Sequence, residues 1–363
     1  MKIAIDIRST LKKRTGIGNY TFGLVNALAR ADKDSQYLLY SYIRPFDFKR
    51  RLWPLPAGNF RHKVDRMSFD PRSTLSGADV VHTSSYDIPS SRSYRLFTTV
   101  HDLVPLMFPH GYSEDYLKGL DGELRRVFRE SKAVIADSEN TKKDIERMFP
   151  DCKPRVEVIY PGRDESFKAM EKKDALNSLG AAYGIHEKFL LYSGGMDPRK
   201  NMPCLVEAFR ILKARFHFPH RLVLTGARGK WAEDTSRLVS QAGLDREVLF
   251  TGYVPSYELN RFYSAADCFV YPSLYEGFGF PILEAFASGT PVVTSAVSSC
   301  AEIASDAALT FDPRDPEGLA AAIRKVLSDK ELSDSLISKG KERAGFFSWD
   351  SSSRRILELF RGR

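Results

Sequence analysis

The chain has 363 residues, which is too long for one ordinary hydrophobic core and predicts two domains. Its hydrophobic content of 43% and charged content of 28% are typical of a soluble globular protein, and no apolar run is long enough to span a membrane as a helix. The net charge of +8 comes mainly from residues 1–180, where 31 Lys and Arg face 24 Asp and Glu, and this excess indicates an anionic partner for that half.

The chain opens with the elements of a nucleotide-binding fold. Residues 2–7 predict a strand, and residues 15–19 predict a glycine turn that leads into a helix. The turn is not the G-x-G-x-x-G fingerprint, because Thr21 occupies the place of the third glycine, so a NAD site is not favoured. Gly16 and Gly18 could let the backbone approach a ligand closely, although a plain tight turn explains them equally well.

A basic and aromatic stretch at residues 44–72 follows a predicted strand at 36–43. Eight basic residues occur in it: Arg44, Lys49, Arg50, Arg51, Arg61, Lys63, Arg66 and Arg72. Aromatic side chains are interleaved with them, and this pattern is typical of a surface that meets anionic lipid headgroups or nucleic acid. A solvated loop whose aromatic residues pack onto the domain is the alternative. No nucleic-acid-binding motif accompanies the stretch, so nucleic acid is not expected as a partner.

Polar clusters follow the next two predicted strands of the first half. One cluster runs from His82 to Tyr86, and the other is His101-Asp102. Ligands of open parallel α/β sheets bind at the carboxyl ends of strands, so these side chains are candidates for an active site. A histidine in such a place can also be a purely structural hydrogen-bonding residue. The adjacent carboxylate makes His101 the stronger candidate of the two histidines.

The rest of the first half continues the α/β alternation. Residues 113–131 predict an amphipathic helix and residues 133–136 a strand, after which Asp137 or Ser138 could cap the next helix. Residues 156–160 predict the last strand of this half.

The second half begins again with a strand and a loop that carries both glycines and cations. Gly194 and Gly195 open the loop, and Arg199 and Lys200 end it just before a predicted helix. Backbone N–H groups exposed by small residues, together with two adjacent cations, are suited to holding an anion. A solvated basic loop is the alternative.

Residues 269–295 predict a strand, a glycine loop, a short helix and a second strand. Glu276 lies in the loop, Pro281 at the first helical position, Glu284 about one turn inside the helix, and Gly289 at its end. A helix N-terminus attracts phosphate, and carboxylates beside it accept hydrogen bonds from hydroxyl groups, so the pair suits a diphosphate that joins two sugars. The alternative is that neither glutamate binds a ligand. Glu284 would then be a favourable charge in the first helical turn, and Glu276 a solvated loop residue.

Two successive α/β halves without hairpins predict an α/β fold with two Rossmann-like domains that face each other across a cleft. We expect an N-terminal domain over residues 1–165 and a C-terminal domain over residues 166–349. A last helix, capped by Asp350, follows Trp349, which is a large apolar anchor.

Cysteine and acidic patterns predict neither disulfides nor a metal site. The four cysteines are far apart and form no C-x-x-C pair, and the first apolar stretch contains Asp6 and is unlike a signal peptide, so we expect a cytoplasmic protein with reduced thiols. No zinc-ligand spacing occurs. Asp32 and Asp34 form an Asp-x-Asp pair in a turn between a helix and a strand. Ligands of such a sheet bind at the carboxyl ends of its strands, which lie at the opposite end of the unit, so we do not expect this pair to hold a metal ion.

Four of these segments together resemble glycosyltransferase family four. They are EGFGFPILE from Glu276 to Glu284, PRKN at 198–201, TGIGNY at 15–20 and HD at 101–102. The resemblance covers essentially the whole chain, and the two-glutamate segment is its most specific part. It implies the GT-B fold, transfer with retention of anomeric configuration, and a C-terminal helix, residues 350–363, that crosses back to the N-terminal domain.

The resemblance also implies roles for the matching positions of the second half. Arg199 and Lys200 would neutralise the donor diphosphate, Glu284 would hold the ribose hydroxyls, and Glu276 would bind the donor sugar. The other donor-binding positions would be Gly194, Gly195, Tyr253, Val254, Gly277, Phe278 and Gly279. Many members carry an arginine where this chain has Gly195, so stabilisation of the leaving group would fall to Arg199 and Lys200 alone.

In the first half, the resemblance implies that His101 approaches the donor sugar, and that Gly16 and Gly18 close over the phosphates and the acceptor. Asp102 and Tyr86 are further candidates for the acceptor side.

The amino-acid sequences of the motifs are most similar to those of mannosyltransferases of bacterial O-antigen and exopolysaccharide assembly. This similarity implies GDP-mannose as the donor, no required cofactor or metal, and a saccharide or lipid-linked saccharide as the acceptor. Residues 44–72 would then rest on the inner face of the cytoplasmic membrane. A UDP-sugar donor, a sugar-nucleotide epimerase, a pyridoxal-phosphate phosphorylase and a non-catalytic binding protein remain alternatives within the same architecture.

Overall fold

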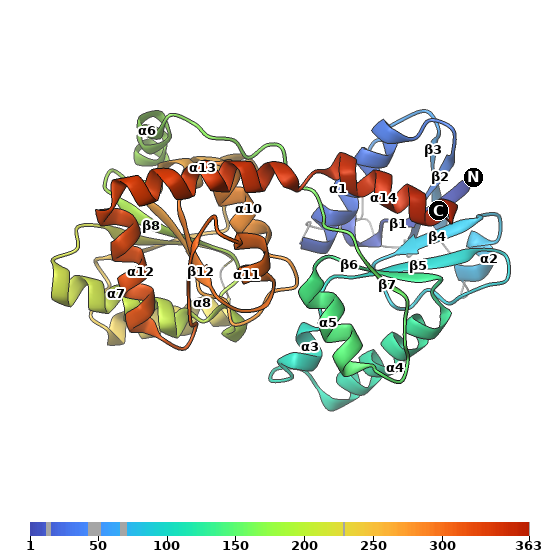
Figure 1. Cartoon of the computed structure of the whole chain (residues 1–363), viewed down its shortest axis with the longest axis horizontal. Helices are drawn as coiled ribbons and strands as arrows, with labels where there is room; N and C mark the ends of the chain where they lie inside the picture. Colours follow the sequence, from blue (N-terminus) through green and yellow to red (C-terminus); the bar gives the residue numbers. More distant parts are fainter. Residues whose placement is uncertain (12–15, 43–51, 66–70, 228, 363) are drawn as a thin grey trace. The chain divides into compact units, whose positions relative to one another are not determined.

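The computed structural model describes residues 1–11, 16–42, 52–65, 71–227 and 229–362. It divides into two compact units (Figure 1). Unit 1 comprises Met1–Gly162 and Phe347–Arg363, and unit 2 comprises Arg163–Phe346. The boundaries expected from the sequence, after residues 165 and 349, each lie three residues beyond those of the structure.

Unit 1 is built on a seven-stranded parallel sheet with the strand order β3-β2-β1-β4-β5-β6-β7. Its strands are β1 (Lys2–Asp6), β2 (Gln36–Tyr42), β3 (Phe60–Asp65), β4 (Val80–Thr83), β5 (Arg95–Val100), β6 (Ala133–Ala136) and β7 (Val156–Val158). Strands β4 and β6 are buried along their whole length, because helices cover both faces of a parallel sheet.

The helices of unit 1 are η1 (Arg8–Thr10), α1 (Gly16–Ala31), α2 (Pro71–Leu75), α3 (Val104–Met107), α4 (Glu114–Glu130), α5 (Glu139–Met148) and α14 (Trp349–Arg361). Among them, α4 and α5 begin at a serine whose hydroxyl satisfies a free N–H group of the first turn. The Ser113 hydroxyl accepts a hydrogen bond from the Tyr116 N–H at 3.3 Å at the start of α4. Ser138 caps α5 in the same way, through the Thr141 N–H at 3.0 Å.

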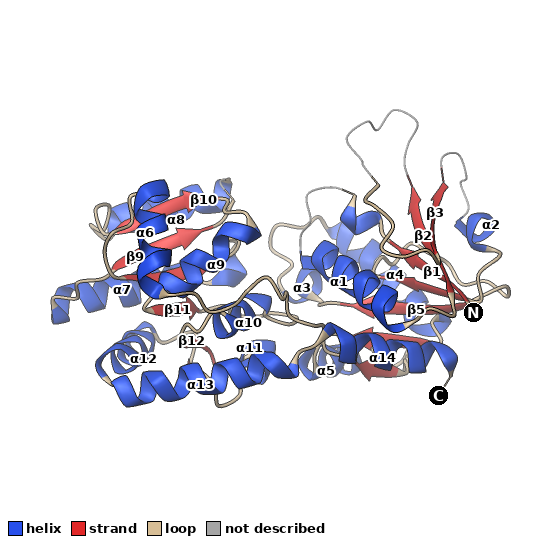
Figure 2. Cartoon of the chain, turned by 90° about the horizontal axis from the view of Figure 1, so that it is seen from above, coloured by secondary structure: helices blue, strands red, loops and turns tan. Residues whose placement is uncertain are grey.

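The C-terminal helix α14 returns to the unit that contains the N-terminus (Figure 2). Trp349 packs so closely on Gly23 and Gly162 that any side chain at either glycine would collide with its indole ring. At the other end of α14, the buried Phe360 ring lies 5.0 Å from that of Phe97. Ser348, whose hydroxyl accepts from the Asp350 N–H, caps the helix, so the expectation that Asp350 is the cap is wrong.

Unit 2 repeats the architecture with a six-stranded parallel sheet in the order β10-β9-β8-β11-β12-β13. Its strands are β8 (Phe189–Ser193), β9 (Arg221–Thr225), β10 (Val248–Gly252), β11 (Cys268–Tyr271), β12 (Val292–Ser295) and β13 (Leu309–Phe311). Its helices are α6 (Lys172–Tyr183), η2 (Pro198–Lys200), α7 (Met202–Phe216), α8 (Lys230–Gln241), α9 (Ser256–Ala265), α10 (Phe280–Ala287), α11 (Ser298–Ala304), α12 (Pro316–Ser328) and α13 (Lys330–Phe346). The predicted pair of Rossmann-like α/β domains is therefore confirmed.

Two local predictions of unit 1 are wrong. Helix α1 already begins at Gly16, so Gly16 and Gly18 lie in its first turn and not in a separate turn before it. Within the basic and aromatic stretch, β3 and the start of α2 were not foreseen, and Phe60 is fully buried in the core. The Trp53 ring packs on the core, and its indole N–H donates to Thr10 Oγ1 at 2.9 Å. For Trp53 and Phe60, this agrees with the alternative that the aromatic residues of the stretch pack onto the domain.

Much of that stretch, including Lys49, Arg50 and Arg51, lies outside the described residues. Across the part of the chain that the structure does describe, no helix is both long enough and apolar enough to cross a bilayer. All four cysteines are free thiols, as expected.

Candidate active site

The order of the strands in unit 2 reverses between β8 and β11, and the loops that follow these two strands carry the predicted donor site. At such a switch point the two loops leave a parallel sheet in opposite directions, which opens a crevice at the carboxyl ends of the strands. The loop after β8 ends with Arg199 and Lys200, and the loop after β11 contains Glu276. The fold therefore brings together residues about 76 positions apart in the chain.

Glu276, Arg199 and Lys200 form a buried ion cluster. Arg199 Nη1 lies 2.7 Å from Glu276 Oε2, and Lys200 Nζ lies 2.6 Å from Glu276 Oε1. The Tyr271 hydroxyl joins the cluster, because it donates to Glu276 Oε1 at 2.9 Å and accepts from Lys200 Nζ at 2.7 Å. Lys200 and Glu276 are each only 8% exposed.

The two cations decide the charge state of the glutamate. Burial alone would raise the pKa of Glu276, but Lys200 and Arg199 outweigh burial and lower the pKa to about 2. The carboxylate in turn helps to raise the pKa of Arg199. Asp197 Oδ1 lies 3.5 Å from Arg199 Nε as a second and more exposed carboxylate, so the two cations face two anions before any ligand is bound.

Backbone contacts tie the two loops together around this cluster. The Leu274 N–H donates to the Arg199 carbonyl at 2.8 Å, and Arg199 Nη1 donates to the Tyr275 carbonyl at the same distance. Asn201, in a left-handed conformation with φ of 59°, donates through Nδ2 to the carbonyls of Pro272 and Pro313. The role of Asn201 was missed, although Asn is a residue that tolerates this conformation and could have been noted for it.

Two glycines are required where the β8 loop begins. Gly194 has a φ of +145°, and a Cβ atom at Gly226, which follows β9, would lie 2.1 Å from the Gly194 carbonyl oxygen. The next carbonyl, that of Gly195, accepts a hydrogen bond from the buried Tyr192 hydroxyl. The backbone of the predicted donor loop is thus fixed by its neighbours.

Helix α10 holds the second glutamate in a different environment. Gly279, with φ of +107°, precedes the helix, and Pro281 is its second residue, one position later than predicted. Glu284 accepts a hydrogen bond from the buried Tyr263 hydroxyl at 2.9 Å. With no cation among its influences, burial raises the pKa of Glu284 to about 7. Tyr263 was not identified from the sequence, because it lies 21 residues away on α9.

The remaining donor-side candidates flank these groups in unit 2. The Glu276 N–H donates to Ser298 Oγ at 3.1 Å and the Ser299 hydroxyl donates to the Glu276 carbonyl at 2.8 Å, so the start of α11 fixes the loop that contains Gly277 and Phe278. Tyr253 and Val254 follow β10, where Tyr253 is 53% exposed and Val254 is buried.

The candidates of the first half occupy the carboxyl ends of the unit 1 strands. His101 Nδ1 lies 2.5 Å from Asp137 Oδ2, and Asp102 Oδ1 accepts from the Val104 N–H at 3.0 Å. Tyr86 is half-buried, and Arg126 donates to its carbonyl. At Gly16 an added Cβ atom would meet nothing within 4 Å, so no close approach in this structure requires a glycine there.

His82 is a structural residue and not part of an open site. It is 2% exposed, its Nε2 lies 2.8 Å from Thr99 Oγ1, and its ring lies 5.9 Å from that of Phe360. Burial lowers its pKa to about 4, so the ring is neutral at physiological pH.

An ionic cluster at the switch point of unit 1 was also missed. Arg8 bonds to both Asp6 and Asp87, with Nη2 2.8 Å from Asp6 Oδ2 and Nη1 2.7 Å from Asp87 Oδ2. The Thr83 hydroxyl donates to Asp6 as well. Arg8 is paired with both carboxylates, and the cluster joins the ends of β1 and β4.

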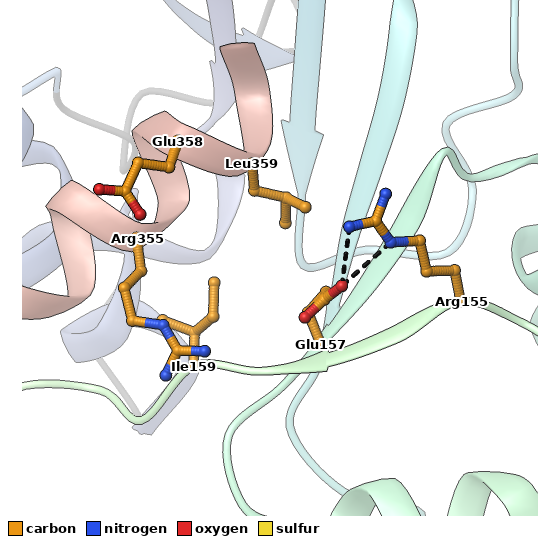
Figure 3. Close-up of a pocket in the computed structure, with 6 residues that line it drawn as sticks. All are labelled: Arg155, Glu157, Ile159, Arg355, Glu358 and Leu359. Carbon is orange, nitrogen blue, oxygen red and sulfur yellow. Dashed lines mark hydrogen bonds and ion pairs between the residues drawn. The ribbon is translucent and has the colours of Figure 1, made fainter. Parts of the chain in front are cut away.

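A hollow of about 110 Å³ between β7 and α14 is lined by none of the predicted site residues (Figure 3). Its lining residues are Arg155, Glu157, Ile159, Arg355, Glu358 and Leu359. Arg155 pairs with Glu157 at 2.8 Å on the β7 side of the hollow, opposite α14. Sites for nucleotide-sized ligands are roughly 300–1,000 Å³, so this hollow is too small for such a ligand.

Comparison with known proteins gives two family matches that together span most of the chain. Residues 14–167 match the family model described as Glycosyltransferase Family 4, and residues 182–343 match the model described as Glycosyl transferases group 1. A curated relative, the O-antigen chain mannosyltransferase B of Escherichia coli, is 30% identical in an alignment of 381 positions that covers 99% of this chain and 100% of that protein.

Solved structures of similar fold are GT-B glycosyltransferases. Sucrose-phosphate synthase from Thermosynechococcus elongatus superposes with a TM-score of 0.78 at 22% identity, over 100% of this chain and 98% of that one. Anabaena HepE in complex with UDP-glucose gives a TM-score of 0.74 at 17% identity over the whole of both chains. The fold expected from the resemblance is therefore confirmed as GT-B.

Glu284 predicts a specific pH dependence of stability. Because its pKa is about 7 in the folded chain and 4.5 ordinarily, the unfolded chain loses this proton first as the pH rises. The stabilisation that protonated Glu284 gives the fold is complete below pH 4.5. It is lost as the pH rises to about 7, and the free energy of unfolding falls by at most about 3 kcal/mol. Urea unfolding from pH 4.5 to 7.5 should show this decline in the wild type and a flatter profile in Glu284→Gln.

The matched control is the exposed Glu331, for which Glu331→Gln should leave the wild-type profile unchanged. Parallel profiles for the wild type and Glu284→Gln would mean that Glu284 titrates normally.

Proposed function

This chain belongs to glycosyltransferase family 4, and we propose that it is a retaining mannosyltransferase that moves a hexosyl unit from GDP-mannose to a saccharide or lipid-linked saccharide acceptor. One observation supports mannose above other sugars, namely the 30% identity, over the full length, to a protein named as an O-antigen chain mannosyltransferase. The acceptor class, a growing cell-surface polysaccharide, is inferred from the same relative. HepE was solved with UDP-glucose, and a UDP-sugar donor is therefore the second candidate.

The ion cluster supports the chemistry at the diphosphate. Departure of the nucleoside diphosphate leaves negative charge on the β-phosphate, and Arg199 and Lys200 are fixed cations beside the predicted phosphate loop. A preorganised donor that stabilises developing charge contributes about 3–4 kcal/mol to lowering the barrier. Because the protein supplies this charge itself, we expect transfer without a divalent cation.

The low pKa of Glu276 restricts what this residue can do. A carboxylate with a pKa of about 2 is a poor proton acceptor at neutral pH, so Glu276 is not suited to general-base catalysis. It remains a good hydrogen-bond acceptor for sugar hydroxyls. In the proposed reaction the acceptor attacks on the face from which the diphosphate departs, and the departing phosphate takes the acceptor proton.

Glu284 is suited to a different contact. Its raised pKa means that both protonation states are populated near neutral pH, and the ionised form accepts hydrogen bonds from ribose hydroxyls. The Tyr263 hydroxyl holds one carboxylate oxygen and leaves the other for the ligand.

The direct test is product formation from defined donors. Purified enzyme should transfer mannose from GDP-mannose to a short mannan or a lipid-linked saccharide, and the rate should persist in EDTA. Thermal shift with GDP-mannose, UDP-glucose, UDP-GlcNAc and ADP-glucose identifies the preferred base, since a ligand at a hundredfold excess over its Kd stabilises by about 2.7 kcal/mol. Transfer from a UDP-sugar alone would replace the GDP proposal, and a changed donor without any acceptor would indicate an epimerase.

Substitutions in the ion cluster should separate binding from transfer. In Glu276→Gln the affinity for GDP should be at least that of the wild type, because Arg199 and Lys200 lose their internal anion, while transfer falls roughly 10²–10³-fold. In Arg199→Ala the GDP affinity itself should fall. Calorimetric titration with GDP and initial rates of transfer measure the two effects.

The control is Asp306→Asn, which removes a carboxylate from an exposed ion pair with Lys339 in the same unit. Both quantities should stay at wild-type values there. If Glu276→Gln lost GDP affinity and transfer to the same degree, Glu276 would not have the role proposed for it.

We also propose that the basic and aromatic stretch at residues 44–72 rests on anionic membrane, which would bring a lipid-linked acceptor to the enzyme. Eight basic residues within 29 positions support this. The triple substitution of Lys49, Arg50 and Arg51 to Glu should abolish co-sedimentation with liposomes that contain anionic lipid. Sedimentation equal to that of the wild type would exclude this membrane contact.

A further inference from the structure

His101 and Asp137 are neighbours because of the register of the unit 1 sheet. Val100 at the end of β5 pairs with Ala136 at the end of β6, so the residues that follow leave the sheet side by side. His101 Nδ1 then lies 2.5 Å from Asp137 Oδ2. The exposed fraction of the histidine side chain is 12% and that of the aspartate is 2%.

The imidazole ring is held from several directions. The Thr141 hydroxyl donates to the His101 carbonyl at 3.2 Å, and Thr141 is itself fixed at the start of α5, where Ser138 caps the helix. The Tyr20 ring from α1 meets the imidazole edge-on, with a centroid distance of 4.7 Å. These contacts fix the plane of the ring, so the direction of its other nitrogen is fixed as well.

That second nitrogen has no role within the described part of unit 1. His101 Nε2 is buried and makes no hydrogen bond to any described residue, and the same holds for Asp137 Oδ1. Leaving a buried polar atom without a partner costs about 1–3 kcal/mol. His82 Nδ1 is unpaired as well, but His82 is 2% exposed, whereas the His101 side chain, at 12%, can be reached by a ligand.

The charges around His101 favour its protonated form. Burial lowers its pKa, but Asp137 and, more weakly, Asp102 outweigh burial and raise the pKa above the ordinary value. Among the described residues, His82 on β4 and Tyr20 on α1 also face it. The lowered pKa of His82 keeps that ring neutral, and burial raises the pKa of Tyr20 and keeps its hydroxyl neutral too. The pKa of His101 is therefore raised where that of its neighbour His82 is lowered, and burial raises the pKa of Asp137 as well.

We propose that Asp137 is a positioning residue for the transfer reaction: it binds His101 through Nδ1–H and so directs an Nε2–H donor at an oxygen of the sugar substrate. The identity of the substrate rests on the proposed function, whereas the link between Asp137 and His101 does not. Asp137 itself touches no substrate. Without Asp137, the buried ring would favour its neutral form. Nε2 would then be able to act as the unprotonated nitrogen, which accepts a hydrogen bond instead of donating one.

The substitution Asp137→Asn tests the proposal, because an amide retains the size of the side chain and loses the charge. The pKa of His101, followed by NMR of its imidazole, should fall from above 6.5 in the wild type to below 6.5 in the variant, since burial then acts almost alone. The kcat should fall roughly 10–100-fold, as is usual when a carboxylate that orients a functional histidine is lost. The activity that remains should increase as the pH is lowered, and the affinity for GDP should stay within about twofold.

A purely structural role for Asp137 would not give this pattern. The control Asp144→Asn changes a carboxylate on α5 that is 8% exposed and bonds to Arg147 at 2.8 Å, and it should move neither the His101 pKa nor the pH profile. Asp137→Asn with an unchanged His101 pKa and an unchanged kcat would overturn the proposal.

Two measurements keep the test independent of folding and of the proposed function. If Asp137→Asn does not fold, the wild-type titration alone decides, because a His101 pKa at or below 6.5 contradicts the proposal. If the wild type transfers no sugar from any donor, the proposed function fails, whereas the titration still decides whether Asp137 controls the protonation of His101.

Discussion

The buried ion cluster of Glu276 with Arg199 and Lys200 is the interaction on which the donor half of the molecule depends. A buried charge is tolerated only when partners satisfy it, so each of the three side chains fixes the other two. The cluster also joins the loops that follow β8 and β11. Beside it, the Leu274 N–H donates to the Arg199 carbonyl, and the Arg199 guanidinium donates to the Tyr275 carbonyl. The two cations are thus already in position before any ligand is bound.

The two glutamates of the EGFGFPILE segment show how environment separates two similar groups. Glu276 sits between cations and has a pKa of about 2, while Glu284, eight positions later, faces a neutral tyrosine hydroxyl and has a pKa of about 7. Pairs of carboxylates whose surroundings shift their pKa values apart are typical of sites that divide chemical roles. The separation here fits one glutamate that is permanently ionised and one whose charge follows the pH.

In unit 1, aromatic packing supports the candidate histidine in addition to its ion pair with Asp137. The Tyr20 ring contacts both the His101 imidazole at 4.7 Å and the Trp349 indole at 5.5 Å. The C-terminal helix is therefore part of the support of His101, although Trp349 and His101 lie almost 250 positions apart in the sequence. Close packing of Trp349 on Gly23 and Gly162 explains why neither glycine could carry a side chain.

The sequence by itself determined the fold class, because alternating strands and helices with turn signals are local properties of the chain. It also indicated which loops carry the charged residues, since Arg199, Lys200, Glu276 and Glu284 stand beside recognisable strand ends and helix starts. Only the tertiary structure decided their partners. Tyr271 and Tyr263 carry no local signal of their roles, and the local signals of Asn201 and Asp137 do not reveal theirs. Each of the four acts through a hydrogen bond to a residue from another loop or strand. The sequence likewise left β3 and the first turn of α1 undetected, since pairing of β3 with β2 and packing of α1 on α14 stabilise them through contacts that are distant along the chain.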